Sequence, residues 1–238
     1  MGGGVLILIF LCVFRSWVED QPERHHNILL RLFDNYVPET LEYLRKNCKQ
    51  IIPISDFAMV QNLCFLLEGI LHPQHGHDLT NELFEHYFVF CVIWAMGGCL
   101  TEEGGSDYRV LFSKWFKKEF CGSSALVRFP DTGSIFDYYV DPECRIIPWK
   151  EMVPRYVHDA DLAFPAIFVE SEETVRLSYL ANLLLRREDG GHPVMFVGMA
   201  GTGKTCIMQH VISNVGDDVI NRSGTFNIST DASTLQLI

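Results

Sequence analysis

The feature that most limits the fold is a glycine-rich loop set between an apolar run and a helical stretch. Residues 198–205 read GMAGTGKT and satisfy the pattern G-x-x-x-x-G-K-[ST] at every fixed position. Before this loop, residues 193–197 form a short apolar run that predicts a central parallel strand. After it, a helix is predicted from about Gly203 to about Asn214. A strand, a tight loop and a helix in this order predict an α/β domain.

The residue types in this loop suit the binding of a phosphate group. Glycine lets the backbone wrap closely around an anion, and the amides at the start of the next helix point toward it. Lys204 can reach the β- and γ-phosphate oxygens, and the Thr205 hydroxyl can join the coordination of Mg²⁺. We therefore predict an ATP or ADP site with Mg²⁺; the alternative is a strand-to-helix turn that binds nothing. The predicted site residues are Gly198, Gly201, Thr202, Gly203, Lys204, Thr205 and Cys206.

Hydrolysis would need further groups, which the sequence does not offer near this loop. An acidic residue at the end of a second apolar strand should hold Mg²⁺, and another group should position the attacking water. The acidic pair Asp217-Asp218 follows no apolar strand and is predicted to lie in a solvated turn. Arg222 falls in the next loop and is not placed as an arginine finger. We predict nucleotide binding without catalytic residues, so the chain alone should not hydrolyse its nucleotide.

The chain before residue 121 is predicted to be helical. One helix should contain residues 28–36, and Pro38 is expected to open another that runs to Lys49. Ser55 or Asp56 should cap a third helix, whose apolar stripe is Val60, Leu63, Cys64, Leu67, Ile70 and Leu71. Residues 87–96 are apolar on all sides, so that helix should be buried before Gly97-Gly98 ends it. A helix over 108–120 is expected to bury Val110, Leu111, Trp115 and Phe116.

Two more segments complete the predicted organisation. Residues 128–149 predict a β-hairpin turning at 141–143, and Pro148, Pro154 and Pro165 mark a domain boundary. Beyond it we expect a helix over 172–187, a second strand over 225–228, and a final helix capped by Ser229 or Asp231. The helix over 172–187 should face inward with Val175, Tyr179, Leu180, Leu183 and Leu184. The predicted domains are an atypical apolar N-terminus, 1–14, a helical region with the hairpin, 15–165, and an incomplete parallel-sheet subdomain, 166–238.

Charge and composition disfavour several kinds of function. The net charge of −11 argues against nucleic acid or an anionic membrane surface as partner, because both need a basic protein surface. The eight cysteines have no CxxC spacing, which disfavours zinc and favours a reduced, intracellular protein. The apolar run 5–14 is too short to span a bilayer and lacks the features of a secretory signal. We interpret it as a core strand or an aberrant start of the gene model.

Three other groups of side chains have simpler structural interpretations. His72, His75 and His77 have no metal-binding spacing and fall in a loop containing Pro and Gly. The aromatic residues of the hairpin could stack nucleobases, but a hairpin core suits this acidic chain better; they are Phe136, Tyr138, Tyr139 and Trp149. Glu170, Glu172 and Glu173 should form the acidic first turn of a helix.

Several longer stretches resemble dynein heavy chains, and the axonemal heavy chains above all. They are residues 34–38 (DNYVP), 84–98 (FEHYFVFCVIWAMGG), 112–115 (FSKW), 135–142 (IFDYYVDP) and 193–198 (PVMFVG) running into the loop. The resemblance covers residues 15–238, whereas residues 1–14 do not look like the family. Met199 stands where the family usually has a polar residue, and Thr205 keeps the hydroxyl of the usual serine.

The resemblance implies both a position and a role. Dynein heavy chains carry six AAA+ modules in a ring, and residues 15 to about 164 look like the C-terminal, helical lid-type part of the second module. Residues from about 166 look like the start of the third, whose nucleotide regulates the motor's response to the main site. Residues 167–174 would contribute to the adenine pocket. The implied context is a microtubule-based motor ATPase of the ciliary or flagellar axoneme. Implied partners are the other ring modules and dynein subunits, with microtubules contacted only through other parts.

Two further functions stay open at this point. A truncated isoform could be a structural or interaction module that binds no nucleotide and packs against ring neighbours. A small-molecule P-loop kinase is disfavoured, because its phosphate loop should lie near the N-terminus with a full sheet after it.

Overall fold

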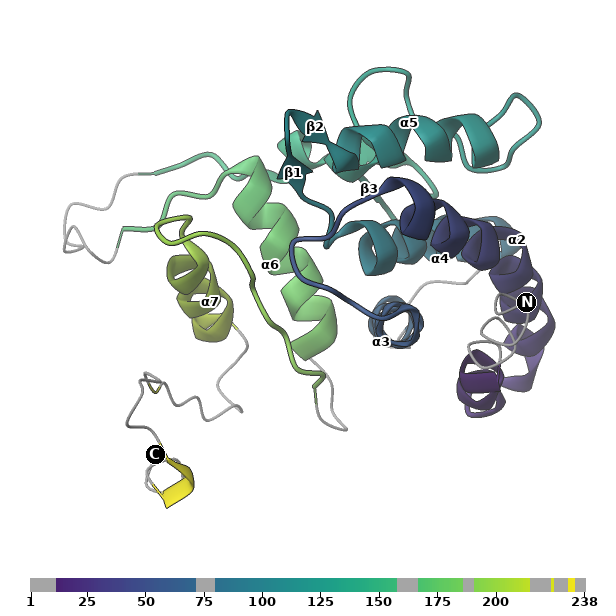
Figure 1. The fold of residues 1–238 in the computed structure, drawn as a ribbon, viewed down its shortest axis with the longest axis horizontal. Coiled ribbons are helices and arrows are strands. Elements are labelled where there is room, and N and C mark those ends of the chain that lie inside the picture. The colour runs from purple at the N-terminus through teal and green to yellow at the C-terminus, as the bar shows by residue number, and fades with distance from the viewer. Residues whose placement is uncertain are drawn as a thin grey trace.

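The computed structural model describes residues 12–71, 80–157, 167–185, 191–214, 224 and 231–233. A helical body built from α2, α3, α4 and α5 lies on one side, and α7 lies on the other (Figure 1). Helix α6 stands between them and contacts both α3 and α7. The predicted second strand, the histidine loop, Asp217-Asp218 and Arg222 all lie outside the described residues.

Helix α2, Glu23–Asn47, is one continuous helix with Pro38 inside it. The prediction that Pro38 opens a separate helix was therefore wrong. An interior proline costs about 3 kcal/mol because it lacks an N–H donor and crowds the preceding turn. Burying one large apolar side chain contributes about 1.5–3 kcal/mol, and the buried stripe runs on both sides of the proline. Its members are Leu29, Leu32, Phe33, Tyr36, Val37, Thr40, Leu41 and Leu44.

Helices α3, Asp56–Ile70, and α4, Asn81–Gly97, form the centre of the helical body. Ser55 caps α3 by accepting a hydrogen bond from the backbone N–H of Ala58 at 3.2 Å, which confirms it as the N-cap. Every residue of α4 from Tyr87 to Met96 is buried, as its unbroken apolar sequence predicts. Gly98 is the C-cap of α4.

Helix α5, Tyr108–Phe120, has the predicted bounds but turns a different face inward. Phe112 and Phe116 are fully buried, whereas Val110 and Leu111 are about two-fifths exposed. The prediction for Val110 and Leu111 was wrong because the inward face carries Phe112, whose ring packs near Tyr43 of α2 and Phe136. Helix α5 follows the short antiparallel pair β1, Glu102–Glu103, and β2, Ser106–Asp107. Asp107 then caps α5 through the N–H groups of Arg109 and Val110.

The hairpin is present, with strands β3, Tyr138–Val140, and β4, Ile146–Pro148. Residues 135–137, expected to be strand, form the 3-10 turn η2, Ile135–Asp137, closed by a Ser134–Asp137 capping box. Asp141 is buried in the hairpin turn. Burial alone would raise the pKa of Asp141, but hydrogen bonds from the backbone and side chain of Arg145 outweigh it and hold that pKa below its ordinary value. The hairpin is followed directly by η3, Trp149–Met152, with Trp149 fully buried.

Helices α6, Glu172–Leu185, and α7, Lys204–Ser213, have nearly the predicted bounds. The strand predicted over 193–197 is not formed: these residues have no strand partner among those the structure describes, and Met195 is 74% exposed. A strand needs at least one neighbour to hydrogen-bond with, and a central strand needs two; the described residues supply none. Within the described part, the sheets are therefore two short antiparallel pairs.

The core divides into a large and a small cluster. The large cluster fills the helical body and includes Phe14, which stacks on Phe33 at 4.3 Å. Residues 12–19 are helical, so the described end of the apolar N-terminal run is core helix rather than the core strand expected. The small cluster joins α6 to α7 through Ala181, Ile207 and Val211. Among the described residues, no helix has the length and apolarity to cross a membrane.

Candidate nucleotide-binding site

The glycine-rich loop turns through left-handed backbone at two of its glycines. Gly201 and Gly203 both have φ +81°, a conformation that side chains other than glycine rarely adopt. A Cβ atom added at either position would meet no atom within 4 Å, so the requirement for glycine comes from the backbone alone. Gly203 is also the N-cap of α7, and the turn therefore leads directly into the helix.

Lys204 folds back over the loop that precedes it. Its Nζ donates to the carbonyl oxygens of Gly198 at 2.9 Å and Met199 at 2.5 Å, and lies 3.4 Å from the Thr202 hydroxyl. That hydroxyl in turn donates to the carbonyl of Met199 at 2.9 Å. The ammonium is thus held beside the glycine turn, where its charge can attract an anion.

The first turn of α7 completes the candidate site. No side chain caps its N-terminus, so the first amides are not used by a capping group. Thr205 and Cys206 lie exposed on this turn, next to Lys204. Open left-handed glycines, a neighbouring ammonium and uncapped helix amides fit a polyphosphate, and the Thr205 hydroxyl fits a ligand of its Mg²⁺. The residues predicted from the sequence are therefore brought together at one place.

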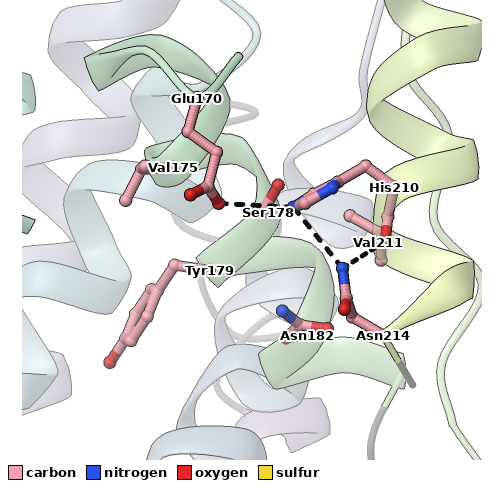
Figure 2. Close-up of a pocket in the computed structure, with 8 residues that line it drawn as sticks. All are labelled: Glu170, Val175, Ser178, Tyr179, Asn182, His210, Val211 and Asn214. Carbon is pink, nitrogen blue, oxygen red and sulfur yellow. Dashed lines mark hydrogen bonds and ion pairs between the residues drawn. The ribbon is translucent and has the colours of Figure 1, made fainter. Parts of the chain in front are cut away.

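The segment ahead of α6 also reaches the loop helix, a contact that the sequence interpretation missed. Phe168 stacks on His210 of α7 at 4.1 Å between ring centroids, and Glu170 faces the same imidazole at 3.3 Å. Glu170 was interpreted as part of an acidic helix turn, within the segment 167–174 that the family resemblance assigns to the adenine pocket, and its carboxylate points across to α7 (Figure 2). No local spacing links Glu170 to His210, so the sequence held no signal for this pair.

A cavity of about 460 Å³ lies between α6 and α7 beside this contact (Figure 2). Ser178 and Asn182 of α6 face it from one side, and His210 and Asn214 from the other. The Ser178 hydroxyl and the Asn182 carbonyl oxygen are buried and have no hydrogen-bond partner among the described residues. The two helices are therefore not tightly packed at this end.

A glycine turn with an adjacent lysine at the start of a helix defines the class of P-loop proteins. Residues 156–238 match the family described as "P-loop containing dynein motor region", and residues 29–151 match the "Dynein heavy chain AAA lid domain". The chain belongs to the dynein heavy chain family.

Named relatives agree with this assignment. The chain is 41% identical over 231 residues to "Dynein beta chain, ciliary" of Heliocidaris crassispina, which covers 95% of this chain. It is 39% identical over 229 residues to "Dynein axonemal heavy chain 9" of Homo sapiens, and this match covers 94% of the chain. It is 33% identical over 232 residues to "Dynein beta chain, flagellar outer arm" of Chlamydomonas reinhardtii, and this match covers 95% of the chain. The chain spans 5% of the length of each of these relatives.

Proposed function

We propose that this chain is a nucleotide-binding segment of an axonemal dynein heavy chain, and that it works within a microtubule-based motor ATPase of cilia or flagella. The names of the relatives and the two matched dynein domains support this context. Residues 15–165 would be the helical end of the second AAA+ module, and residues from 166 the start of the third. Its partners would be neighbouring ring modules and dynein subunits, in the cytoskeleton of the axoneme.

The observation that carries the nucleotide proposal is the placement of Lys204 beside the two left-handed glycines at the start of α7. Backbone amides of residues 201–205 would bind the phosphates, and Lys204 would neutralise their charge. Thr205 would hold the Mg²⁺ that accompanies ATP or ADP, and the cation would screen the phosphate oxygens. Residues 167–174 would contribute to the adenine pocket.

The role proposed for this site is regulatory rather than hydrolytic. Hydrolysis needs an acidic residue near Mg²⁺ and a group that positions water. We assign neither to this chain, so bound ATP should persist rather than turn over. The nucleotide would then act by changing how firmly the loop and α7 are held.

Titration of the chain with fluorescent ADP and Mg²⁺ tests this function. We expect measurable binding by the chain, and at least a tenfold rise in Kd for Lys204→Ala, because the main counter-charge to the phosphates is lost. Lys118→Ala is the matched control, since Lys118 is an exposed lysine on α5. Equal Kd values for the Lys204 and Lys118 variants would contradict the proposed site.

A second candidate function is a structural or interaction module without nucleotide. The observation that favours it is the apolar exposure of Met195, Val197 and Met199, which are 74%, 40% and 80% exposed. Absence of nucleotide binding by the unmodified chain, together with concentration-dependent self-association, would favour this alternative.

A further inference from the structure

Two histidines flank the phosphate loop, and each has the same kind of surroundings. His192 precedes the loop and stacks on Phe65 of α3, with 3.7 Å between ring centroids and 13° between ring planes. His210 follows the loop and stacks on Phe168 at 4.1 Å and 14°. Each imidazole Nε2 also meets a carboxylate oxygen, of Glu68 at 2.8 Å and of Glu170 at 3.3 Å.

The two groups attach the loop to different parts of the molecule. Phe65 and Glu68 belong to α3, in the region that matches the dynein lid domain. The other oxygen of Glu68 accepts a hydrogen bond from the Trp17 indole N–H at 2.5 Å, which ties this group to the N-terminal helix. Phe168 and Glu170 lie in the segment ahead of α6, and the Asn214 amide donates to the His210 carbonyl at 2.8 Å.

Apolar packing alone secures the loop helix weakly. Helix α7 has ten residues, and a helix of that length is marginally stable in water without tertiary contacts. Only Ile207 and Val211 of α7 are buried, and the cavity between α6 and α7 removes part of the remaining packing. The aromatic and polar contacts of the two histidines therefore supply much of what fixes α7 and the loop.

We propose that Phe65–His192–Glu68 and Phe168–His210–Glu170 are paired clamps that hold the phosphate loop in position for its nucleotide from both ends. The six side chains are positioning residues, because the contacts that define each clamp are made to one another rather than to a nucleotide. This inference rests on the proposed nucleotide site. Loosening either clamp should raise the mobility of the loop and α7 and speed the release of nucleotide.

Hydrogen exchange of the full 238-residue chain, measured by mass spectrometry without nucleotide, tests the clamps. In His192→Gln and His210→Gln, exchange of amides in residues 194–214 should rise about three- to tenfold, because local opening no longer has to break the ring stack and the imidazole–carboxylate contact. Exchange in residues 83–97, the centre of the helical body, should not change. His26→Gln is the matched control. The ring of His26 contacts the backbone carbonyl of Gln21, and both residues lie near the N-terminal end of the chain, far from the loop in the sequence.

Two conservative variants of Phe168 distinguish a role in positioning the loop from a role in the stability of the whole chain. Phe168→Leu should show the same faster exchange and a three- to tenfold faster dissociation of fluorescent ADP with Mg²⁺, whereas Phe168→Tyr keeps the stack and should behave as the unmodified chain. Unchanged exchange in 194–214 for both histidine variants, or an equal rise in 83–97, would overturn the clamps. If the unmodified chain binds no ADP while the exchange effects are present, the proposed function fails and the clamps remain as structural contacts.

Discussion

At the scale of single residues, the phosphate loop depends on backbone conformation more than on side-chain contacts. Gly201 has φ +81°, and nothing lies within 4 Å of the place where a Cβ would stand. An alanine there would therefore meet no steric clash with its surroundings but would strain its own backbone by about 1–2 kcal/mol.

We expect Gly201→Ala to weaken ADP binding by about 5- to 30-fold, since about 1.4 kcal/mol corresponds to a factor of ten in Kd. The melting temperature of the helical body should stay within a degree or two, because the loop is exposed and outside the large core cluster. Fluorescence titration and circular dichroism provide the two measurements. Gly122→Ala is the control: its Cβ would also meet nothing, but its φ is not left-handed. Equal Kd values for the two variants would contradict the role of the turn.

Single residues also differ in whether their place in the site could be predicted from the sequence. The residues from Gly198 to Cys206 are contiguous, and their spacing alone identifies the turn, the cation and the hydroxyl. Phe168 and His210 lie on separate elements and come together only when α6 packs on α7. A contact of that kind has no local pattern, so it could not be predicted from one sequence.

At the scale of elements, α6 links the two core clusters. Tyr179 makes edge-to-face contacts with Phe90 of α4 and Trp149 of η3, both of which belong to the large cluster. Arg176 reaches the Phe136 carbonyl at 3.3 Å and lies over the Trp94 ring at 5.6 Å. Ala181, in turn, belongs to the small cluster with α7. The sequence predicted one inward face for α6, but both of its faces are used.

Helices α3 and α6 approach each other closely at Gly69. A Cβ on Gly69 would lie 2.3 Å from the carbonyl oxygen of Leu183, so Gly69→Ala would force the two helices apart. Overpacking of this kind costs about 1–3 kcal/mol, against a gain of about 1 kcal/mol from the better helix propensity of alanine. We expect a net loss of stability in urea unfolding and faster exchange in residues 191–197, next to the His192 clamp. Asn62→Ala, exposed on α3, is the control, and a Gly69→Ala variant as stable as this control would contradict the prediction.

Two wrong predictions also belong to this scale. Pro38 was expected to start a helix, but the buried stripe of α2 continues across it. The run over 193–197 was expected to be a strand, but strand structure needs backbone partners, which the described residues do not provide. Propensity and periodicity describe one segment at a time, whereas both outcomes depend on what lies beside the segment.

At the scale of the whole molecule, the unequal core clusters predict unfolding in two steps. Among the described residues, the large cluster contains every fully buried aromatic side chain, and all four tryptophans belong to it or pack against it. The small cluster has three buried members. In urea, α7 and the loop should therefore open first, with little change in tryptophan fluorescence. The helical body should follow in a separate cooperative transition.

Saturating Mg²⁺ and ADP should shift only the first step, by about 2.7 kcal/mol at a hundredfold excess over Kd. Tryptophan fluorescence would follow the helical body, and hydrogen exchange of residues 194–214 would follow the loop and α7. A single transition, coincident by both measurements and moved as a whole by nucleotide, would show instead that the two clusters unfold together.

The sequence by itself determined the phosphate loop, the bounds of most helices, the hairpin and the family, because each depends on residues that are neighbours along the chain. Tertiary structure alone decided that α2 continues through Pro38, that α5 buries Phe112 rather than Val110, and that α6 packs on both sides. It also decided that two histidines at either end of the loop face matching Phe and Glu side chains. These outcomes follow from burial and from contacts between distant segments, and their free energies are defined only once those segments are packed together.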